Sequence, residues 1–188
     1  MAQTSTSILS SKSHKADITG TDISFVVSSG VYKITSTSTS LSNLAVRDLI
    51  TVSGTTNNNS TFTVKEVTDA NNIVVEEIVT AESSDGSTTT TIDHTGFVSD
   101  KQKGDGYYSQ PDGVHTIAYK VDTTLTGSIK MQGTLAISPT ETDYFDISGT
   151  EFTGSDGSFS YNFTGNYVWV RAIVVYTGGT VQSVLLNH

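Results

Sequence analysis

The sequence predicts an all-β protein made of two small antiparallel β-sandwich or barrel domains, preceded by an extended N-terminal arm. Ser and Thr together supply 57 of the 188 residues, charged residues make up only 15%, and the chain has two prolines. Threonine and the other β-branched residues favour strands, and residues that favour helices are scarce. Apolar and polar residues also alternate in short runs, repeated about every ten to twelve residues, as in sandwiches and barrels.

Composition and charge exclude several classes of protein. The net charge of −9 is opposite in sign to that of a nucleic-acid-binding protein. The absence of cysteine excludes disulfides, thiol catalysis and thiolate zinc sites. No apolar run reaches the roughly 18 residues of a membrane-spanning helix, and the first residues lack the apolar core of a secretory signal. We therefore expect no nucleic-acid partner and no membrane partner.

Charge and aromatic content divide the chain into three parts. Residues 1–16 carry a net charge of +2 and form the expected arm. Residues 17–97 carry −7 and hold four aromatic residues, whereas residues 98–188 carry −4 and hold the other twelve. We therefore place the two domains at 17–97 and 98–188. Residues 97–106 are polar, contain two glycines and show no apolar period, which predicts a linker or long loop.

Alternating residues predict six strands in the first domain, separated by polar turns. In the first strand Ile23, Phe25 and Val27 fall on one face, because successive side chains of a strand point to opposite sides. Residues 53–60 and 69–72 are rich in Asn, Asp, Ser and Gly, which are typical of turns. The six predicted strands cover residues 22–27, 31–34, 48–52, 61–67, 73–79 and 88–92.

The second domain is predicted to hold longer strands and a heavier apolar core. The alternation over 129–137 places five residues on one face: Ile129, Met131, Gly133, Leu135 and Ile137. Residues 166–176 are apolar on both faces, which is typical of a central strand. Gly178 and Gly179 then predict a type I′ hairpin to residues 180–186, because both central positions of that turn need a positive φ.

No residue pattern indicates a catalytic, cofactor or metal site. The four histidines are not spaced as metal ligands, and the Asp-Gly pairs are more typical of turns than of Ca²⁺ loops. A catalytic serine needs a base and an oxyanion hole, and the G-x-S-x-G motif is absent. Nineteen Asp and Glu residues offer many carboxylate pairs for glycoside hydrolysis and single out none. We therefore expect a protein that is not an enzyme and binds no cofactor or metal.

The aromatic residues of the second domain allow two interpretations. Tyr107, Tyr108, Tyr144, Phe145 and Trp169 either fill the core or a subunit contact, or they form an exposed platform on which a sugar stacks. Trp169 lies mid-strand among aliphatic residues, so we expect it to be mostly buried. Two or three exposed, coplanar rings would favour the glycan platform. Tyr107, Tyr108 and Tyr144 are therefore candidate partner-binding residues.

The arm is predicted to lie along another subunit and to add a strand to a sheet edge. Its backbone needs hydrogen-bond partners wherever it is buried, and strand addition supplies them. Ile8 and Leu9 are its large aliphatic residues and would anchor it in an apolar recess. Lys12 and Lys15 would meet acidic patches. These four residues complete the set of candidate partner-binding residues.

The first domain resembles a module of tailed-bacteriophage virion proteins. In that module an apolar residue precedes a G-D-x-I-T-V-S-G strand, an N-N-G-T-[FY]-T-V strand and an I-x-V-x-E strand. The matching residues lie within 22–92, and the clearest are Asp48-Leu49-Ile50-Thr51-Val52-Ser53-Gly54, Asn58-Asn59-Ser60-Thr61-Phe62-Thr63-Val64 and Val74-Val75-Glu76-Glu77. Arg47 and Ser60 stand where glycine is usual, so we expect different turn geometries at these two positions.

The second domain is similar to another β-sandwich of phage particles, over most of residues 104–188. This resemblance implies a fold and a virion context and brings no catalytic residues. The residues that carry it are Gly104-Asp105-Gly106-Tyr107-Tyr108, Asp112-Gly113-Val114-His115-Thr116, Gln132-Gly133-Thr134-Leu135-Ala136, Asp143-Tyr144-Phe145-Asp146-Ile147, Phe163-Thr164-Gly165-Asn166-Tyr167-Val168-Trp169-Val170-Arg171-Ala172 and Leu185-Leu186-Asn187-His188.

Together the two resemblances imply an accessory structural protein of a phage particle, of the head-decoration or neck type. We expect a capsid decoration or cement protein on the surface of the head or neck, which stabilises the assembled head through inter-subunit contacts. Its partners would be the major capsid protein or other virion proteins, and further copies of itself in a homo-oligomer such as a trimer. The alternatives are a neck, collar or tail accessory protein, and a glycan-binding adhesion module that touches a host-surface glycan.

Overall fold

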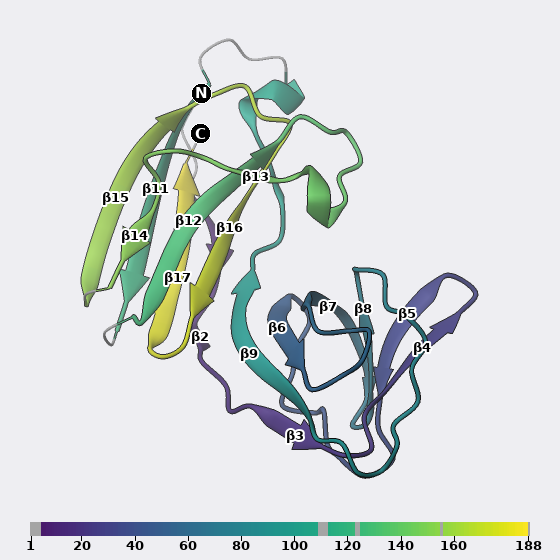
Figure 1. The fold of residues 1–188 in the computed structure, drawn as a ribbon. Helices are drawn as coiled ribbons and strands as arrows, with labels where there is room; N and C mark the ends of the chain where they lie inside the picture. The colour runs from purple at the N-terminus through teal and green to yellow at the C-terminus, as the bar shows by residue number, and fades with distance from the viewer. Residues whose placement is uncertain (1–4, 109–112, 123–124, 155, 188) are drawn as a thin grey trace. The chain divides into compact units, whose positions relative to one another are not determined.

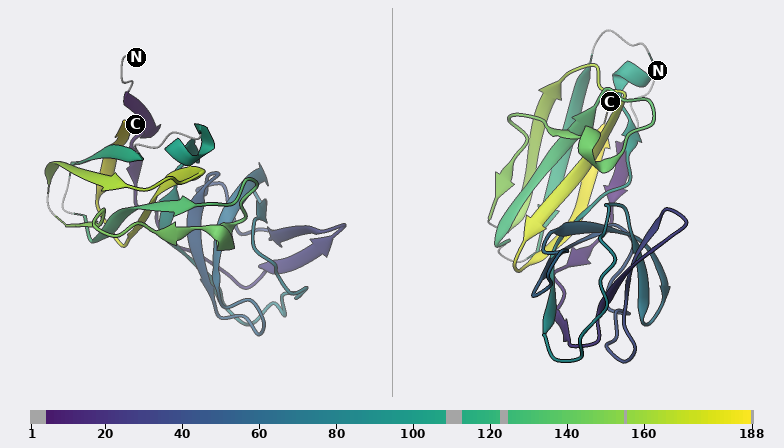
Figure 2. Two further views of the ribbon diagram at one scale, coloured as in Figure 1. Left: turned by 90° about the horizontal axis from the view of Figure 1, so that it is seen from above. Right: turned by 45° about the vertical axis from the view of Figure 1, so that its right-hand side comes forward.

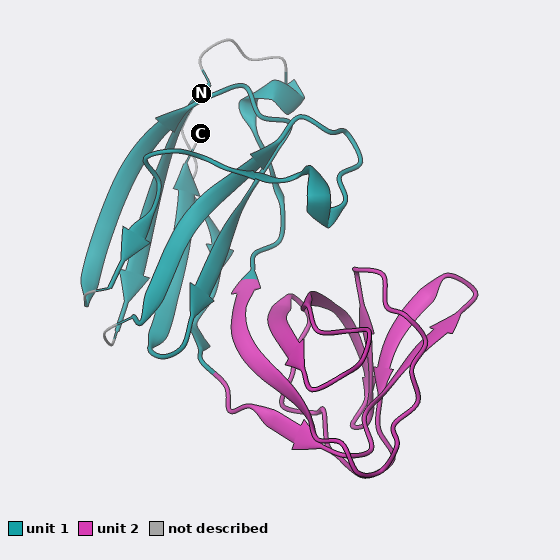
Figure 3. Ribbon diagram, viewed as in Figure 1, with its two compact units in different colours: residues 1–14, 98–188 teal, residues 15–97 magenta. Residues whose placement is uncertain are grey.

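The predicted all-β class is confirmed. Strands make up 54% of the chain and helical residues 4%, and the sheets are antiparallel. The described residues group into two compact units (Figure 3): residues 15–97 form the first, and residues 5–14 with 98–187 form the second. The computed structural model (Figure 1) describes residues 5–108, 113–122, 125–154 and 156–187.

The first unit is a single antiparallel sheet that bends along one strand. The strand order is β3-β9-β6-β7-β8-β5-β4. The start of β7 pairs with β6, and the rest of β7 pairs with β8 through two register shifts, which increase the local twist. The strands are β3 (Ile18–Gly20), β4 (Ser24–Ser28), β5 (Val31–Thr35), β6 (Asp48–Ser53), β7 (Thr61–Asp69), β8 (Asn72–Val75) and β9 (Thr90–Val98).

Side chains from all these strands and from the loops between them fill one core, which is aliphatic except for two phenylalanines. The buried members are Ile18, Ile23, Phe25, Ile34, Leu41, Leu44, Ile50, Val52, Phe62, Val64, Ile73, Val75, Val79 and Ile92. Two details of the prediction are wrong. Val27 is exposed, because the β4–β5 hairpin extends beyond the core at this point. The strand predicted over 73–79 ends at Val75.

Arg47 has a backbone conformation that favours glycine. Its φ is +75°, in the left-handed region that side chains rarely adopt. The Arg47 amide donates to the Val64 carbonyl at 2.8 Å, and the next amide, of Asp48, donates to Ala45 at 3.1 Å. We expected another turn geometry where arginine replaces the usual glycine, whereas Arg47 takes the left-handed conformation that glycine readily adopts.

The second unit is a sandwich of two antiparallel sheets, which Figures 1 and 2 show as two layers. One sheet has the order β1-β17-β11-β15 with β2 also on β17, and the other has β13-β12-β16 with β14 on β12 and β10 on β16. Two short 3₁₀ helices, η1 (Asp105–Tyr108) and η2 (Glu141–Asp143), lie in the connections. The strands are β1 (Ser5–Leu9), β2 (Lys12–Ser13), β10 (Gln102–Lys103), β11 (Val114–Val121), β12 (Gly127–Thr134), β13 (Phe145–Asp146), β14 (Phe152–Thr153), β15 (Gly157–Thr164), β16 (Trp169–Tyr176) and β17 (Thr180–Asn187).

The core of the sandwich holds large aromatic side chains as well as aliphatic ones. Tyr119 and Tyr176 are fully buried between the sheets. The Tyr119 hydroxyl donates to the Thr150 carbonyl at 2.8 Å, and burial raises the pKa of Tyr119 far above its usual value. The other buried members include Ile117, Val121, Ile129, Met131, Phe152, Phe163, Val170, Ala172, Val174, Val181, Val184 and Leu186.

The predicted terminal hairpin is wrong. β16 pairs with β12 and β17 pairs with β11, so the two strands lie in different sheets. The connection instead bonds to Thr126, which donates to the Gly178 carbonyl at 3.2 Å and accepts from the Thr177 amide at 2.8 Å. The apolar faces of β16 and β17 therefore cover one core from opposite sides. Of the two glycines, Gly179 has a positive φ, of 93°.

The strand predicted over 129–137 is shorter than expected. β12 ends at Thr134, and the side chains of Leu135 and Ile137 are 65% and 79% exposed. Ile129 and Met131, on the same predicted face, are fully buried. The alternation therefore identifies the core face correctly but continues past the end of the sheet.

The arm is extended and adds a strand to a sheet edge, but that edge belongs to its own chain. β1 and β2 both pair with β17, and Ile8 and Leu9 are buried, at 6% and 7% exposure. The expectation that they anchor the arm on another subunit is corrected, because this apolar recess lies within the same sandwich. Residues 1–4 of the arm, and Asp112 and His188 of the second resemblance, lie outside the described residues.

The segment predicted as a linker is part of the sandwich. Ser99 donates its amide to Ala172 at 2.9 Å, and the Ala172 amide donates to the Ser99 hydroxyl at the same distance. β10 then pairs with β16. The backbone polar groups of this segment therefore have partners in β16, which explains why a polar sequence without apolar alternation is held in place.

Candidate functional site

An aromatic and basic surface lies on the outer side of the sandwich, where the segment after β9 crosses the start of β16. We define this aromatic surface by Lys101, Lys103, Tyr107, Tyr108 and Trp169. Tyr107 and Tyr108 are 42% and 51% exposed. β10 positions Lys103 directly opposite Trp169 in the strand register, and η1 carries the two tyrosines.

Two glycines allow η1 to sit close to the backbone before β16. The Gly104 amide donates to the Val168 carbonyl at 3.0 Å, and the Gly106 amide donates to the Tyr167 carbonyl at 3.0 Å. A Cβ atom on Gly104 would lie 2.4 Å from the Tyr167 carbonyl oxygen, and one on Gly106 would lie 2.3 Å from that of Asn166. The G-D-G-Y-Y sequence is therefore required sterically to bring its tyrosines beside Trp169.

A buried acid and a buried histidine support this motif from below. Asp105, between the two glycines, is 5% exposed, and His115 on β11 is fully buried. The His115 Nε2 atom lies 4.0 Å from an Asp105 carboxylate oxygen. The imidazole stacks on the ring of Phe163 at 4.7 Å, with an angle of 3° between the planes. His115 and Asp105 thus fix the base of the aromatic surface, and sequence spacing did not indicate this pair.

The three rings of the aromatic surface touch one another at steep angles. The ring centroids of Tyr107 and Tyr108 are 5.3 Å apart with planes at 74°, and those of Tyr107 and Trp169 are 5.1 Å apart with planes at 58°. The Trp169 Nε1 atom donates to the Ile137 carbonyl at 3.0 Å. These rings are therefore not coplanar, and the flat platform that would favour a glycan is not formed here.

Two lysines lie over the faces of these rings. The Lys101 ammonium is 4.5 Å from the Trp169 ring centroid, and that of Lys103 is 4.2 Å from Tyr107 and 5.7 Å from Tyr108. A cation over an aromatic face is attracted by the ring quadrupole. The surface therefore presents positive charge on apolar rings in a chain whose net charge is −9.

Trp169 is partly covered, in keeping with the predicted burial, but it does not lie between the sheets. It is half-buried and lies on the outer face of β16, whereas its neighbours Val170 and Ala172 point into the core. Tyr107 and Lys101 cover its ring in place of a second sheet. Of the two predicted settings for Trp169, the position between the sheets is therefore corrected, whereas a subunit contact stays a prediction.

Tyr144 belongs to a different cluster on the same sheet. The guanidinium carbon of Arg171 lies 3.7 Å from the Tyr144 ring centroid. Arg171 also donates to Glu141 at 2.6 Å and to the Gln132 side chain at 3.0 Å. Arg171 is only 4% exposed, and its salt bridge to Glu141 neutralises its charge within the chain. The half-buried ring of Tyr144 lies beside this buried ion pair.

The two lysines of the arm, Lys12 and Lys15, lie against residues of their own chain. Lys12 lies on β2 opposite Val181. Lys15 donates to the buried Asp48 carboxylate at 2.5 Å, and its amide donates to His94 Nδ1 at 3.2 Å. Burial opposes ionisation of Asp48, but His94 and Lys15 outweigh it and lower its pKa. Lys15 therefore meets an acidic residue, as expected, but within the first unit.

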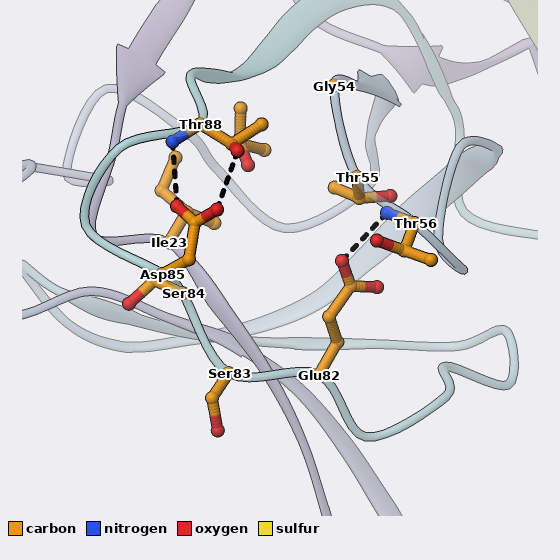
Figure 4. A pocket seen from close by; sticks show the side chains of 10 residues that line it. Ile23, Gly54, Thr55, Thr56, Glu82, Ser83, Ser84, Asp85 and Thr88 are labelled. Carbon is orange, nitrogen blue, oxygen red and sulfur yellow. Dashed lines mark hydrogen bonds between the residues drawn. The ribbon is translucent and has the colours of Figure 1, made fainter.

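A polar pocket of about 150 Å³ lies in the first unit (Figure 4). Serine and threonine residues line much of it, together with Glu82 and Asp85. Glu82 accepts hydrogen bonds from the amides of Thr56 and Asn57 at 2.7 and 2.9 Å. Burial alone would raise the pKa of Glu82, but the hydrogen bonds from these amides have the larger effect. The pKa of Glu82 is therefore lowered.

The second carboxylate of this pocket is held in the same way. The Asp85 carboxylate accepts from the Thr88 amide and from the Thr88 hydroxyl, both at 2.7 Å (Figure 4). It also accepts from the Ser87 amide at 2.8 Å. These bonds hold the pKa of Asp85 well below its usual value. A general acid needs a raised pKa, whereas the pKa values of Glu82 and Asp85 are lowered. Because both carboxylates accept hydrogen bonds from loop amides, they are suited to fixing these loops.

Comparisons with protein-family models and with curated proteins were made. No protein-family model matches the chain, and no curated protein matches it. Within the described residues, His, Asp and Glu form no group of three that could hold a metal ion. None of the described helices has the length and apolarity needed to cross a membrane.

Proposed function

We propose that this chain is a non-enzymatic structural protein of a tailed-bacteriophage particle, and that it decorates or cements the assembled capsid. The observation that carries the proposal is the aromatic surface, which exposes Tyr107 and Tyr108 beside Trp169. Tyr and Trp are enriched among the residues that contribute most to protein–protein binding. The lysines over these rings would pair with acidic groups on a neighbouring subunit.

The rest of the chain supports a role in surface contact. The virion-like motifs of both halves supply the context, and the G-D-G-Y-Y motif builds the aromatic surface. A specific contact buries about 1,600 Å² in total. On a symmetric particle many such contacts add through their high effective concentration. Binding by many copies could therefore reinforce a shell without any chemical step.

A neck, collar or tail position is the second candidate, because the same surface would serve any subunit contact. The glycan-binding alternative is less well supported. Its rings would have to be coplanar, whereas the planes of Tyr107 and Tyr108 meet at 74°. Lys103 also occupies the space over both rings. A sugar could stack there only if this lysine moved away.

The proposal is tested by locating the protein in particles. Particles from a phage that encodes this chain are purified, the chain is quantified by mass spectrometry, and its position is determined by cryo-electron microscopy. We expect many symmetry-related copies on the outside of the head, with the aromatic surface against a neighbouring subunit. Density at the neck or tail would select the second candidate. Absence of the chain from purified particles would contradict a structural role.

A second experiment tests the surface itself. The variant Lys101→Glu/Lys103→Glu should bind particles that lack the protein about tenfold or more weakly, because it reverses two interfacial charges. The matched control Lys65→Glu/Lys120→Glu makes the same change in net charge at exposed positions outside the aromatic surface. We expect the control to bind as the wild type does. Equal loss in both variants would show that net charge governs binding, whereas wild-type binding of both would exclude these lysines from the contact.

A further inference from the structure

Most sheet edges in the described chain are blunted against pairing with another molecule. In one sheet of the sandwich, the edge strands β10, β13 and β14 have two residues each. In the other sheet, β1 has a register shift after Ser7 and β2 carries Lys12. In the first unit β3 has three residues, and Phe25 of β4 bridges to Glu82. Short strands, bulges and lysines are devices that prevent edge-to-edge association.

β15 has none of these devices. It is the last strand of its sheet, eight residues long, and pairs with β11 without a register shift. Figure 1 shows it at the outer side of the sandwich. Its sequence, GSFSYNFT, contains no charged residue and no proline. Among the described residues no strand pairs with its second side. A long, uncharged, regular edge is a template for another strand.

We propose that β15 pairs with β15 of a second copy of this chain, antiparallel and about a twofold axis at Tyr161. In this register Phe159 lies opposite Phe163 of the second copy, and Tyr161 lies opposite itself. Ser160 lies opposite Asn162, and Ser158 lies opposite Thr164. The sheet β1-β17-β11-β15 would thereby continue into the same sheet of the second copy. The inference deepens the proposed function, on which it rests for its biological setting, by naming a surface for self-association.

The sequence of β15 is chemically symmetric about Tyr161, and this symmetry selects a second copy as the partner. Phe159, Tyr161 and Phe163 form the more buried face, with Phe163 in the core, whereas the serines, Asn162 and Thr164 form the exposed face. Directly opposite residues of paired strands share a face, so the aromatic side chains meet aromatic ones and the polar side chains meet polar ones. A twofold axis at Ser160 would pair as many residues of β15 but would place Phe163 opposite Gly157, whereas the axis at Tyr161 pairs every aromatic residue with another aromatic residue.

The aromatic face and the polar face of β15 would contribute to the dimer contact in different ways. Phe159 already stacks on Phe152 at 4.2 Å, and Tyr161 lies 5.7 Å from the Tyr119 ring, so the aromatic residues are held in place before association. On the exposed face, Asn162 Oδ1 accepts from the Thr116 hydroxyl at 2.9 Å. This bond turns the side-chain amide so that its nitrogen can donate to Ser160 of the second copy. Because a twofold contact uses the free edge of β15 in both copies, association through this edge stops at a dimer.

Single cysteines test the register directly, because the chain has no cysteine. In the proposed dimer, Ser158→Cys of one copy lies opposite Thr164→Cys of the other. An equimolar mixture of the two single variants should therefore form a covalent dimer with a short bis-maleimide. Each variant alone should not, because residues six apart along a strand are about 20 Å apart. Dimer from Ser158→Cys alone would indicate another register and would overturn the proposal, as would the absence of dimer from the mixture.

Sedimentation of the purified protein tests the strength of the contact. We expect the wild type to dimerise, and Ser160→Lys/Asn162→Lys to raise the dimer dissociation constant by about tenfold or more, because like charges then lie opposite each other. The control Ser148→Lys/Thr153→Lys adds the same charge at exposed positions outside β15 and should dimerise normally. A wild type that stays monomeric, or a dimer that resists the β15 lysines, would contradict the proposal. Neither result depends on where the protein lies on a particle.

Discussion

The two units differ in how their most distinctive charged side chains are used. In the first unit, carboxylates such as Asp22, Glu82 and Asp85 accept hydrogen bonds from the amides of nearby loops. In the sandwich, Lys101 and Lys103 lie over exposed aromatic rings. Charges bonded to backbone amides fix loops, whereas cations that cover apolar rings remain available to a partner.

This difference assigns the two units different roles. The first unit has an aliphatic core and polar turns, and its carboxylates hold those turns in place. The sandwich concentrates aromatic residues both in its core and on its outer face. We therefore expect the first unit to behave as a scaffold in binding experiments, and the sandwich to carry the contacts with partners.

The largest expected effect separates the two units by stability. Phe62 is buried in the core of the first unit, and Phe62→Ala should lower its free energy of unfolding by about 3–5 kcal/mol. Trp169, the only tryptophan, lies in the sandwich and reports on that unit. In urea unfolding of the variant, we expect circular dichroism to show an early transition while the tryptophan fluorescence keeps its midpoint. A simultaneous shift of both signals would contradict independent units.

A smaller effect is expected from Trp169→Ala. The indole is half-buried on the outer face of β16, so its removal should cost about 1–2 kcal/mol of stability, in proportion to the apolar area that it covers. Denaturant unfolding followed by circular dichroism measures this cost, and Trp169→Phe should retain most of the stability. A loss of about 3–5 kcal/mol would be typical of a core residue and would place Trp169 between the sheets after all.

The loop carboxylates should make the first unit sensitive to acid. Hydrogen bonds from the Thr39 hydroxyl and the Ser38 amide hold the pKa of Asp22 well below its usual value. A lowered pKa in the folded state stabilises the protein above the unfolded-state value of about 3.9, and this contribution is lost as the pH falls below it. Thermal unfolding between pH 7 and pH 2 should therefore show a shallower acid loss for Asp22→Asn than for the wild type. The exposed Asp17→Asn serves as the control, and identical curves for both variants would refute this role.

The smallest effect is expected at Arg47. A non-glycine residue in the left-handed region costs about 1–2 kcal/mol, and glycine loses about 0.5–1 kcal/mol more backbone entropy on folding. Arg47→Gly should therefore increase the free energy of unfolding by up to about 1 kcal/mol, whereas Arg47→Ala should not increase it. Chemical denaturation distinguishes the two variants. A destabilised Arg47→Gly would mean that contacts of the arginine side chain outweigh the backbone strain.

Apolar residues that alternate or run together between polar turns predicted several of the longer strands. This signal located β6, β7 and β16 closely, and the structure buries three consecutive residues in each of these strands. The same signal was present in two strands that were not predicted. In β11, Ile117, Tyr119 and Val121 point inward. In β15, the aromatic residues alternate with small polar ones.

Alternation could not show which sheet a strand joins. Gly178 and Gly179 are typical of a hairpin, yet β16 and β17 lie in different sheets, because the core they cover lies between them. The arm shows the same limit. Its extended form followed from its composition, but its pairing with β17 of its own chain depends on a recess for Ile8 and Leu9 that only the folded sandwich provides.

The candidate site was predicted in part. Tyr107 and Tyr108 stand out as adjacent aromatic residues in a glycine-containing segment, and the structure exposes both. Lys101 and Lys103 were missed, because only the pairing of β10 with β16 brings them over the rings. The two nearby glycines, which approach the backbone closely, are the one sequence signal that could have indicated this pairing.

Hydrogen–deuterium exchange of the free and the particle-bound protein tests the central claim most directly, because it compares both units in one experiment. We expect binding to protect the backbone amides of residues 101–108 and 135–137, around the aromatic surface, and to leave the first unit unchanged. Protection confined to residues 15–97 would contradict the account, because the partner would then contact the unit that we identify as the scaffold.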